Sequence, residues 1–168
     1  SNLASYADKI SKEVGFCGDR EMASGYSWSS QPSSTIYYAG YGRLVQNSSS
    51  VNPTFKCSNS NDLYTTSSSS KGNKKLANPI GLITADEVVM GGLPWSGSTT
   101  SNYLYTGQHY WTMSPCYYPS AGVFGVYSGG NLGAWNVDVA IGVRPVINLS
   151  ADVKVTGSGT SSDPFVVS

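Results

Sequence analysis

Cys116 and His109 are the two side chains in this sequence best suited to nucleophilic catalysis. A cysteine nucleophile needs a base within hydrogen-bond reach, and the base in turn needs a group that orients it. His109 is the only histidine, it lies seven residues before Cys116 across an expected strand, and no orienting group is evident in the sequence. We therefore predict that Cys116 is a free thiol or a contact residue, that no residue is catalytic, and that the protein is not an enzyme.

Asp86 and Glu87 offer a second chemistry, because paired carboxylates carry out acid–base hydrolysis. The segment Thr84-Ala-Asp-Glu87 also fits the capping box, in which the threonine and glutamate side chains each bind a backbone N–H at a helix start. Acidic residues in a first helical turn interact favourably with the helix dipole. We therefore favour a capping role for this segment over a catalytic one.

The sequence has few side chains suited to binding a metal ion. Neither the Cys-x-x-Cys nor the Cys/His spacing of structural zinc sites is present. Trp135-Asn-Val-Asp138 resembles the Trp-Asn-Asp calcium triplet of sugar-binding C-type lectins, but Val137 is inserted. Calcium takes six to eight oxygen ligands, and Asp138 is the only acidic residue between Glu87 and Asp152. We predict no metal site and no cofactor.

The segment from Pro115 to Asp138 is rich in side chains that make contacts. Tyr and Trp give a large contact area with few rotatable bonds, and Ser, Gly and Asn give adaptable hydrogen bonds, as in antibody paratopes. If Val123, Gly125 and Tyr127 share one face of a strand, alternation puts Phe124 and Val126 on the other face. Alternation does not say which face is inward, and we choose Phe124 and Val126 as the inward pair, which leaves Tyr127 outward. The alternative is that about half of these rings only fill the core beneath the loops. The predicted binding residues are Tyr117, Tyr118, Tyr127, Asn131, Trp135 and Asn136.

Two expected core strands enclose this segment. The first is Tyr110–Met113, followed by Ser114-Pro115, and the second covers residues 143–149. Strand-length runs separated by Pro, Ser and Gly indicate an antiparallel sheet with long loops. Helical spacing of apolar residues predicts a helix over residues 2–14, and a shorter helix is expected from Thr84 to Met90, ended by two glycines.

The remaining segments are short. Residues 35–39 and 42–45 are expected to be short strands or extended core segments, and residues 53–57 another extended piece. Residues 59–75 have few apolar side chains and are interpreted as a surface loop anchored by Leu63 and Tyr64. Residues 150–168 are expected to form a C-terminal β-hairpin tail, because alternating apolar residues flank a Gly/Ser turn.

Length and composition limit the class of protein. A chain of 168 residues predicts one domain covering residues 1–168. Only 12% of the residues are charged, and ten basic residues balance ten acidic ones, so no basic surface for nucleic acid is expected. The longest apolar runs fall short of the 18 residues that a membrane helix needs, so we expect no membrane insertion of this segment. Three cysteines leave at least one outside any internal disulfide.

Six motifs occur along the chain in a fixed order. Together they resemble an uncharacterised extracellular domain family of low-GC Gram-positive gut bacteria, found on large surface or pilin-like proteins. Family sequences usually continue upstream, so we expect the native protein to extend before Ser1. The motifs are Phe16-Cys-Gly-Asp-Arg20, Tyr41-Gly-Arg-Leu44, Gly81-Leu-Ile-Thr-Ala-Asp-Glu-Val88, Tyr103-Leu-Tyr-Thr-Gly107, Tyr110-Trp-Thr-Met-Ser-Pro115 and Gly142-Val-Arg-Pro-Val-Ile-Asn-Leu149.

Two of these motifs, Trp111-x-x-Ser-Pro115 and Gly142-Val-Arg-Pro145, also resemble the C-type-lectin-type fold of the formylglycine-generating-enzyme group. The same fold is used by the variable binding proteins of diversity-generating retroelements. This resemblance implies an α+β, C-type-lectin-like domain with a twisted antiparallel sheet, two helices and long loops. Fold alone does not imply function. The enzyme group uses paired cysteines, and its chemistry is not carried over to a segment whose only cysteine is Cys116.

The resemblance also bears on Cys17 and Cys57, which lie in two segments that look like family anchors. It implies a disulfide between them, and the alternative is two buried thiols. Arg144 is read either as an anion clamp or, in the interpretation that we favour, as a partner of loop carbonyls or of Asp86 or Glu87. The same structural interpretation applies to three other charged residues, Asp19, Arg20 and Arg43.

Taken together, the sequence predicts a non-catalytic adhesion module at the bacterial cell surface. Its expected partner is a host or bacterial surface protein or a glycan, and its expected location is extracellular. Two alternatives remain open: a structural stalk or pilus-tip module, and a cysteine-dependent enzyme.

Overall fold

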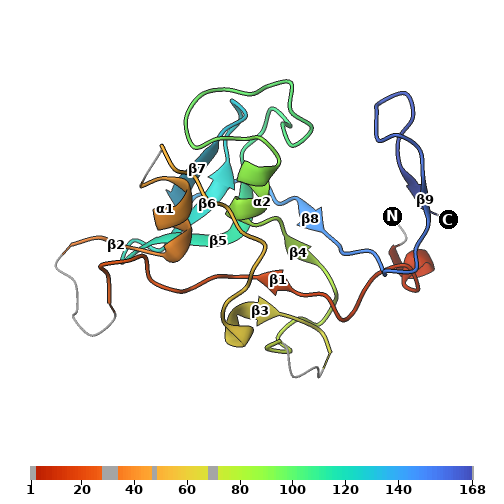
Figure 1. Cartoon of the computed structure of the whole chain (residues 1–168), viewed down its shortest axis with the longest axis horizontal. Helices are drawn as coiled ribbons and strands as arrows, with labels where there is room; N and C mark the ends of the chain where they lie inside the picture. The colour runs from red at the N-terminus through yellow and green to blue at the C-terminus, as the bar shows by residue number, and fades with distance from the viewer. Residues whose placement is uncertain (1–2, 28–33, 47–48, 68–71, 168) are drawn as a thin grey trace.

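A computed structural model describes residues 3–27, 34–46, 49–67 and 72–167. They form a mixed α+β fold with few helices and antiparallel sheets (Figure 1). A four-stranded sheet has the order β2-β5-β6-β7, and helices α1 and α2 pack against one of its faces. The bounds are β2 Ile36–Tyr37, β5 Tyr110–Tyr118, β6 Gly122–Val126, β7 Leu132–Asn136, α1 Ala39–Leu44 and α2 Ala85–Met90.

Three two-stranded antiparallel pairs complete the fold: β1 with β3, β4 with β8, and β9 with β10. The β9–β10 pair confirms the predicted C-terminal hairpin. The β1–β3 pair confirms Leu63 and Tyr64 as the anchor of the loop 59–75. Residues 68–71 of that loop lie outside the described part. The strands are β1 Phe16–Cys17, β3 Leu63–Tyr64, β4 Gly81–Leu82, β8 Pro145–Val146, β9 Val155–Thr156 and β10 Val166–Val167, and two 3₁₀ turns are η1 Leu3–Tyr6 and η2 Ser60–Asp62. Within the described residues, no helix is long and apolar enough to span a membrane.

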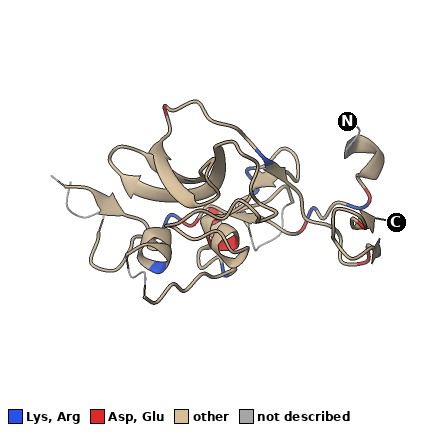
Figure 2. Ribbon diagram, turned by 90° about the horizontal axis from the view of Figure 1, so that it is seen from above, with Lys and Arg blue, Asp and Glu red and all other residues tan. Residues whose placement is uncertain are grey.

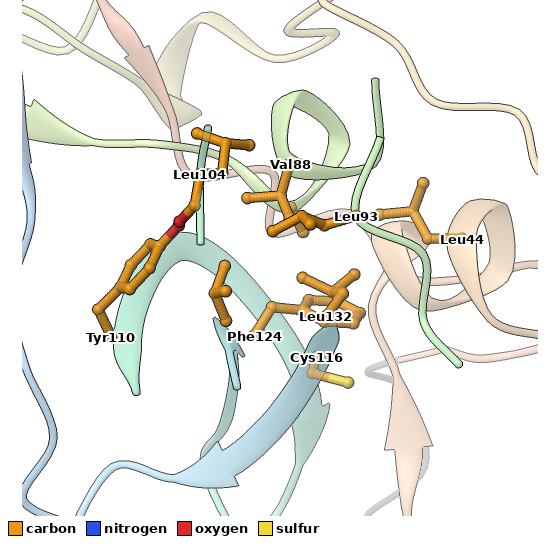
Figure 3. Close-up of a cluster of buried hydrophobic side chains, with 10 residues drawn as sticks. Leu44, Val88, Leu93, Leu104, Tyr110, Cys116, Phe124 and Leu132 are labelled. Atoms are coloured by element: carbon orange, nitrogen blue, oxygen red, sulfur yellow. The ribbon is translucent and has the colours of Figure 1, made fainter. Parts of the chain in front are cut away.

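The core lies between α1, α2 and one face of the four-stranded sheet (Figure 3). Phe124 and Val126 point into it and are fully buried, which confirms the predicted side-chain phase of β6. Leu44 from α1 and Val88 from α2 meet these side chains from the other side. Trp95 packs edge-on against Phe124 with ring centroids 5.9 Å apart, so it closes the core as an aromatic plug.

Strand β5 is longer than the sequence predicted. We expected the strand to end before Ser114-Pro115, but it continues to Tyr118. Its register with β6 shifts on both sides of Pro115. Proline lacks a backbone N–H and is tolerated in a strand where the ladder is already interrupted, so the bulge lets the strand pass through it.

The predicted capping box at the start of α2 is confirmed. The Thr84 hydroxyl accepts the N–H of Glu87 at 3.1 Å, and the Glu87 carboxylate accepts the N–H of Thr84 at 2.7 Å. Ser114 on β5 adds a third cap, because its buried hydroxyl accepts the N–H of Ala85 at 2.9 Å. The helix ends at Gly91 and Gly92 as expected, and Gly92 takes the positive φ of 95°. Helix and sheet are therefore joined by a hydrogen bond as well as by apolar packing.

The helix predicted over residues 2–14 is wrong for the described residues, and Asn2 lies outside them. Only the 3₁₀ turn η1 forms there. Residues 9–11 instead pair with residues 148–150, since Ser11 N–H donates to the Asn148 carbonyl at 2.8 Å and Ser150 N–H donates to that of Lys9 at 2.9 Å. Tyr6, which the helix would have buried, is 56% exposed. A short amphipathic helix gains little without a surface to pack on, so the strand-like pairing prevails.

Two other expected segments also differ. Residues 42–45, expected to be short strands or extended core segments, belong largely to α1, because Leu44 of that helix enters the core. Of the core strand expected over residues 143–149, only β8 forms, and Val143 is 66% exposed.

An ion-pair network holds four segments together. Arg43 on α1 donates from Nε and Nη2 to the two carboxylate oxygens of Asp86 at 3.0 and 2.9 Å, and from Nη2 to Asp19 at 2.5 Å. The Thr54 N–H donates to the same Asp86 carboxylate at 2.9 Å. Burial disfavours the charged form of Arg43, but the hydrogen bonds to Asp86 and Asp19 outweigh it and raise the pKa of the guanidinium.

The disulfide between Cys17 and Cys57 is present in the structure, as the resemblance implied. It joins β1 to the segment that carries Thr54, so it links two of the segments that the Arg43 network also joins. The cross-link spans 40 residues.

We expect the Cys17→Ala/Cys57→Ala double variant to lose about 4 kcal/mol of unfolding free energy, the chain-entropy value for a loop of this length. Urea denaturation followed by tryptophan fluorescence measures the loss. A Cys116→Ala variant serves as the control for replacing a buried thiol. A double variant as stable as the native protein would show that the bond does not form.

We expect Arg43→Met to lower the unfolding free energy by about 3 kcal/mol, because it leaves the Asp86 carboxylate buried without its ion partner. The Asp86 side chain is only 5% exposed. The matched control is Lys9→Met, whose partner Asp8 is on the surface; we expect it to change stability by less than about 0.5 kcal/mol. Equal effects of the two substitutions in urea denaturation would contradict the structural role of Arg43.

Candidate functional site

The face of the sheet opposite α1 and α2 carries a row of glycines beside aromatic residues. Trp111 on β5 pairs with Gly125 on β6, which pairs in turn with Gly133 on β7. Opposite residues in an antiparallel ladder share a face, so the two glycines lie side by side next to Trp111. Two neighbouring strands therefore have no side chain of their own at this level, which leaves room for rings from adjacent positions.

Two rings occupy the space that these glycines leave. Trp135 on β7 leans over Gly125, where a Cβ would lie 2.7 Å from the indole ring. Tyr127, just after β6, leans the opposite way over Gly133 and covers the position that a Cβ would take. The two rings are stacked, with centroids 4.0 Å apart and an interplanar angle of 24°. Each ring is half-buried and keeps part of its surface open to solvent.

His109 and Trp111 complete this group. The His109 ring meets Tyr127 and Trp135 edge-on at centroid distances of 5.3 and 5.1 Å. Trp111 stands nearly perpendicular to Trp135, with centroids 6.1 Å apart. His109 Nδ1 accepts the N–H of Ser128 at 3.2 Å, which ties the ring to the turn after Tyr127. We call His109, Trp111, Tyr127 and Trp135 the outer aromatic cluster.

A second group of rings surrounds Tyr117, at the edge of the sheet near α1. Tyr37 on β2 stacks on Tyr41 of α1 with centroids 3.8 Å apart, and meets Tyr26 and Tyr117 edge-on. The Tyr117 hydroxyl donates to the Asn136 amide oxygen at 3.0 Å. Burial raises the pKa of Tyr117 and of Tyr41. This tyrosine cluster (Tyr26, Tyr37, Tyr41 and Tyr117) packs partly against the core.

The six predicted binding residues are therefore not gathered in one place. Tyr127 and Trp135 lie in the outer aromatic cluster, while Tyr117 and Asn136 lie with the tyrosine cluster. Asn131 links its hairpin to the loop after α2, since its amide donates to the carbonyls of Trp95 and Leu132 at 3.4 and 3.1 Å. The sixth residue, Tyr118, pairs with Ile36 of β2 and is half-buried.

Cys116 was predicted to be a free thiol or a contact residue. It is a free thiol, and it is too buried to contact a ligand. Its side chain is 1% exposed and belongs to the core cluster (Figure 3). Burial raises the pKa of this thiol to about 12, so the thiolate that nucleophilic chemistry needs is strongly disfavoured at neutral pH.

The arginine residues weighed in the sequence have structural partners. Arg144 donates from Nη1 to the Leu104 carbonyl at 3.1 Å and lies 5.6 Å from the Tyr110 ring centre, so a loop carbonyl is its partner. Arg20 binds the carboxylate of Asp62 from Nε at 2.6 Å. Asp138 lies on an exposed loop. No group of three or more His, Cys, Asp or Glu side chains is arranged to hold a metal in the part of the chain that the structure describes.

Sequence reasoning missed His109 and Trp111 as members of the outer aromatic cluster. His109 was weighed only as a base, and Trp111 only as part of a strand that carries the fold. The available signal was the pair of glycines at 125 and 133, flanked by aromatic residues on the same strand face. Glycine inside a strand often marks close approach of another group, and here that group is a ring from the neighbouring strand.

Comparison of the chain with protein-family models, with curated proteins and with solved structures finds no match. Its function is therefore argued from its own residues.

We expect iodoacetamide at pH 8 to leave the native protein unlabelled, because Cys116 is buried and its pKa is raised to about 12. Unfolding without a reductant should release one reactive thiol, and unfolding with a reductant should release three. Mass spectrometry of the labelled protein counts them. Rapid labelling of Cys116 in the native state would contradict the buried, protonated thiol and reopen the question of cysteine chemistry.

Proposed function

We propose that this chain is a non-catalytic ligand-binding module that acts in adhesion at a bacterial cell surface and binds a protein or a glycan. The observation that carries the proposal is the outer aromatic cluster, in which stacked Tyr127 and Trp135 rings rest on strand glycines rather than in the core. Half-exposed aromatic rings held in fixed positions are typical anchors of recognition surfaces. The partly open tyrosine cluster around Tyr117 is a second contact surface on the same sheet.

The state of Cys116 supports a binding role over a cysteine-dependent enzyme. A catalytic cysteine needs a lowered pKa and access to substrate. Cys116 is enclosed by the core, with a raised pKa, whereas His109 bonds to Ser128 on the turn after β6. We further propose that the fold is a variant of the C-type-lectin-like fold and that the chain belongs to the surface-protein family that its motifs resemble.

The disulfide supports an extracellular location, because such bonds persist mainly in oxidising environments. An experimental structure, compared with lectin-type domains, tests the fold proposal.

One region favours a structural role as a second candidate. The turn η1 and the hairpin β9–β10 lie beside each other at one end of the molecule, away from the four-stranded sheet (Figure 1). They expose apolar side chains there, including Tyr6, Phe165 and Val166, with Phe165 66% exposed. Grouped exposed apolar residues often mark contacts between proteins or domains. This end of the molecule is suited to packing against a neighbouring domain in a stalk or pilus tip.

An array of glycans and of host and bacterial surface proteins distinguishes these roles. We expect the native chain to bind at least one array member and the Tyr117→Ala/Tyr118→Ala/Trp135→Ala variant to lose that binding, because it removes rings from both aromatic surfaces. The control is Phe165→Ser, which alters only the hairpin end. Loss of binding in the hairpin variant but not in the triple variant would show that the binding surface lies at the end formed by η1 and the β9–β10 hairpin. No binding by the native chain to any array member would contradict the proposed function.

A further inference from the structure

We propose that the outer aromatic cluster binds a neutral pyranose unit of a glycan, with its sugar ring packed against Trp111 and the Tyr127–Trp135 stack. This inference rests on the proposed binding function and names its ligand class and its location. It places the principal contact at His109, Trp111, Tyr127 and Trp135, and leaves Tyr117 and Tyr118 outside it.

The charge pattern of the chain favours a neutral ligand. Residues 88–137 contain no Asp, Glu, Lys or Arg. This uninterrupted stretch includes all of β5, β6 and β7, which carry no charged side chain (Figure 2). The first charged residue after Trp135 is Asp138, which is acidic. A sulfated or carboxylated sugar would therefore find no cation on these strands to neutralise it.

The arrangement of the rings suits a sugar. One face of many pyranose rings presents C–H groups, and an aromatic face carries the negative part of its quadrupole, so the two attract. Trp111 stands at 85° to Trp135, and therefore the cluster presents ring surfaces in two directions. The Ser128 hydroxyl lies beside these rings, 3.4 Å from His109 Nε2, with which it forms a hydrogen bond. Because a hydroxyl has one donor and two acceptor positions, Ser128 keeps hydrogen-bonding capacity for a sugar hydroxyl.

The cluster is also fixed before any ligand arrives. Tyr127 and Trp135 stack on each other, rest on Gly133 and Gly125, and are held by edge contacts from His109. His109 is fixed in turn by the Ser128 N–H and by its own carbonyl, which accepts the N–H of Gly142 at 2.9 Å. Preorganised side chains lose little conformational entropy on binding, which matters for a ligand that makes few contacts.

The size of the cluster favours a sugar over a folded protein. The four aromatic side chains have at most about 200 Å² of surface each and expose no more than about a third of it, so together they expose at most about 300 Å². A stable protein interface takes about 800 Å² from each partner. A sugar ring, by contrast, is similar in size to one aromatic ring, so one or two pyranose units match the exposed rings.

The test is a titration of ¹⁵N-labelled protein, monitored through its tryptophan indole N–H signals. The probes are tetrasaccharides of glucose, mannose, galactose and N-acetylglucosamine, together with the tetramer of galacturonic acid as the acidic match to galactose. We expect at least one neutral probe to shift the signals of Trp111 and Trp135, and the acidic probe to shift neither. Trp95, which packs on Phe124 in the core, is the internal reference.

Variants test the same surface by affinity. We expect Trp111→Ala and Trp135→Ala to raise the Kd of the neutral probe by roughly tenfold or more, and the conservative Trp135→Phe to recover part of the loss. Gly133→Ala should also weaken binding, because the new methyl group displaces the Tyr127 ring while all four rings remain present. Tyr103→Ala is the control, since Tyr103 is 73% exposed and lies outside the cluster.

The outcomes separate this inference from the proposed function. Binding of a neutral probe that shifts other signals, or that is lost only in Tyr117→Ala/Tyr118→Ala, would overturn the location and keep the binding function. Binding of the acidic probe alone, or of a protein alone, would overturn the ligand class. If the neutral probes shift no indole signal at millimolar concentration, the inference is wrong, whether or not the array detects a protein partner.

Discussion

The contact between Arg43 and Asp86 is the constraint on which the rest of the fold depends. A buried carboxylate is costly unless it is paired and hydrogen-bonded, and the Asp86 carboxylate meets that requirement with Arg43 and the N–H of Thr54. These bonds require α1, α2 and the segment before Cys57 to meet at one point, and Asp19 brings in the chain after β1. The disulfide links two of the same segments covalently. Because α1 and α2 are fixed in this way, the core face of the sheet has a defined surface to pack against.

The three strands β5, β6 and β7 then serve two purposes through side-chain alternation. Their inward residues, such as Phe124, Val126 and Leu132, are fully buried against the helices. Their outward positions include Gly125 and Gly133, which leave room for rings from neighbouring strands. Glycine in a strand costs conformational entropy and contributes no side chain to packing. The stacking of Tyr127 on Trp135 covers the two glycines and offsets part of that cost. The same stacking leaves ring surface half-exposed on the side away from the core.

How far the sequence predicts this structure depends on how local each signal is. The capping box at Thr84, the inward phase of Phe124 and Val126, and the terminal hairpin depend on neighbouring residues, and all are confirmed. The disulfide followed from a resemblance and is also present. The failures involve distant partners: residues 9–11 pair with residues 148–150 instead of forming a helix, and α1 forms despite two glycines because Leu44 enters the core.

The candidate site follows the same rule. Sequence identified Tyr127 and Trp135 from composition but grouped them with Tyr117, because it had no means of knowing the register shifts at Pro115. Those shifts accompany the division of the aromatic residues into two clusters.

The separation between what holds the fold and what forms the candidate site has a physical consequence. The ion pairs of Arg43 and Arg20 and the disulfide lie in segments 17–20, 43, 54–57, 62 and 86. The outer aromatic cluster lies within a stretch of 50 residues, 88–137, that has no charged side chain. Rings seated on glycine backbone contribute less to the core than Phe124 or Leu132 do, since they face away from it. Substitutions at Trp111, Tyr127 or Trp135 therefore alter contact chemistry at a smaller cost in stability than changes on the inner face. A sheet arranged in this way can vary its outer aromatic residues while its ion pairs, disulfide and core stay the same.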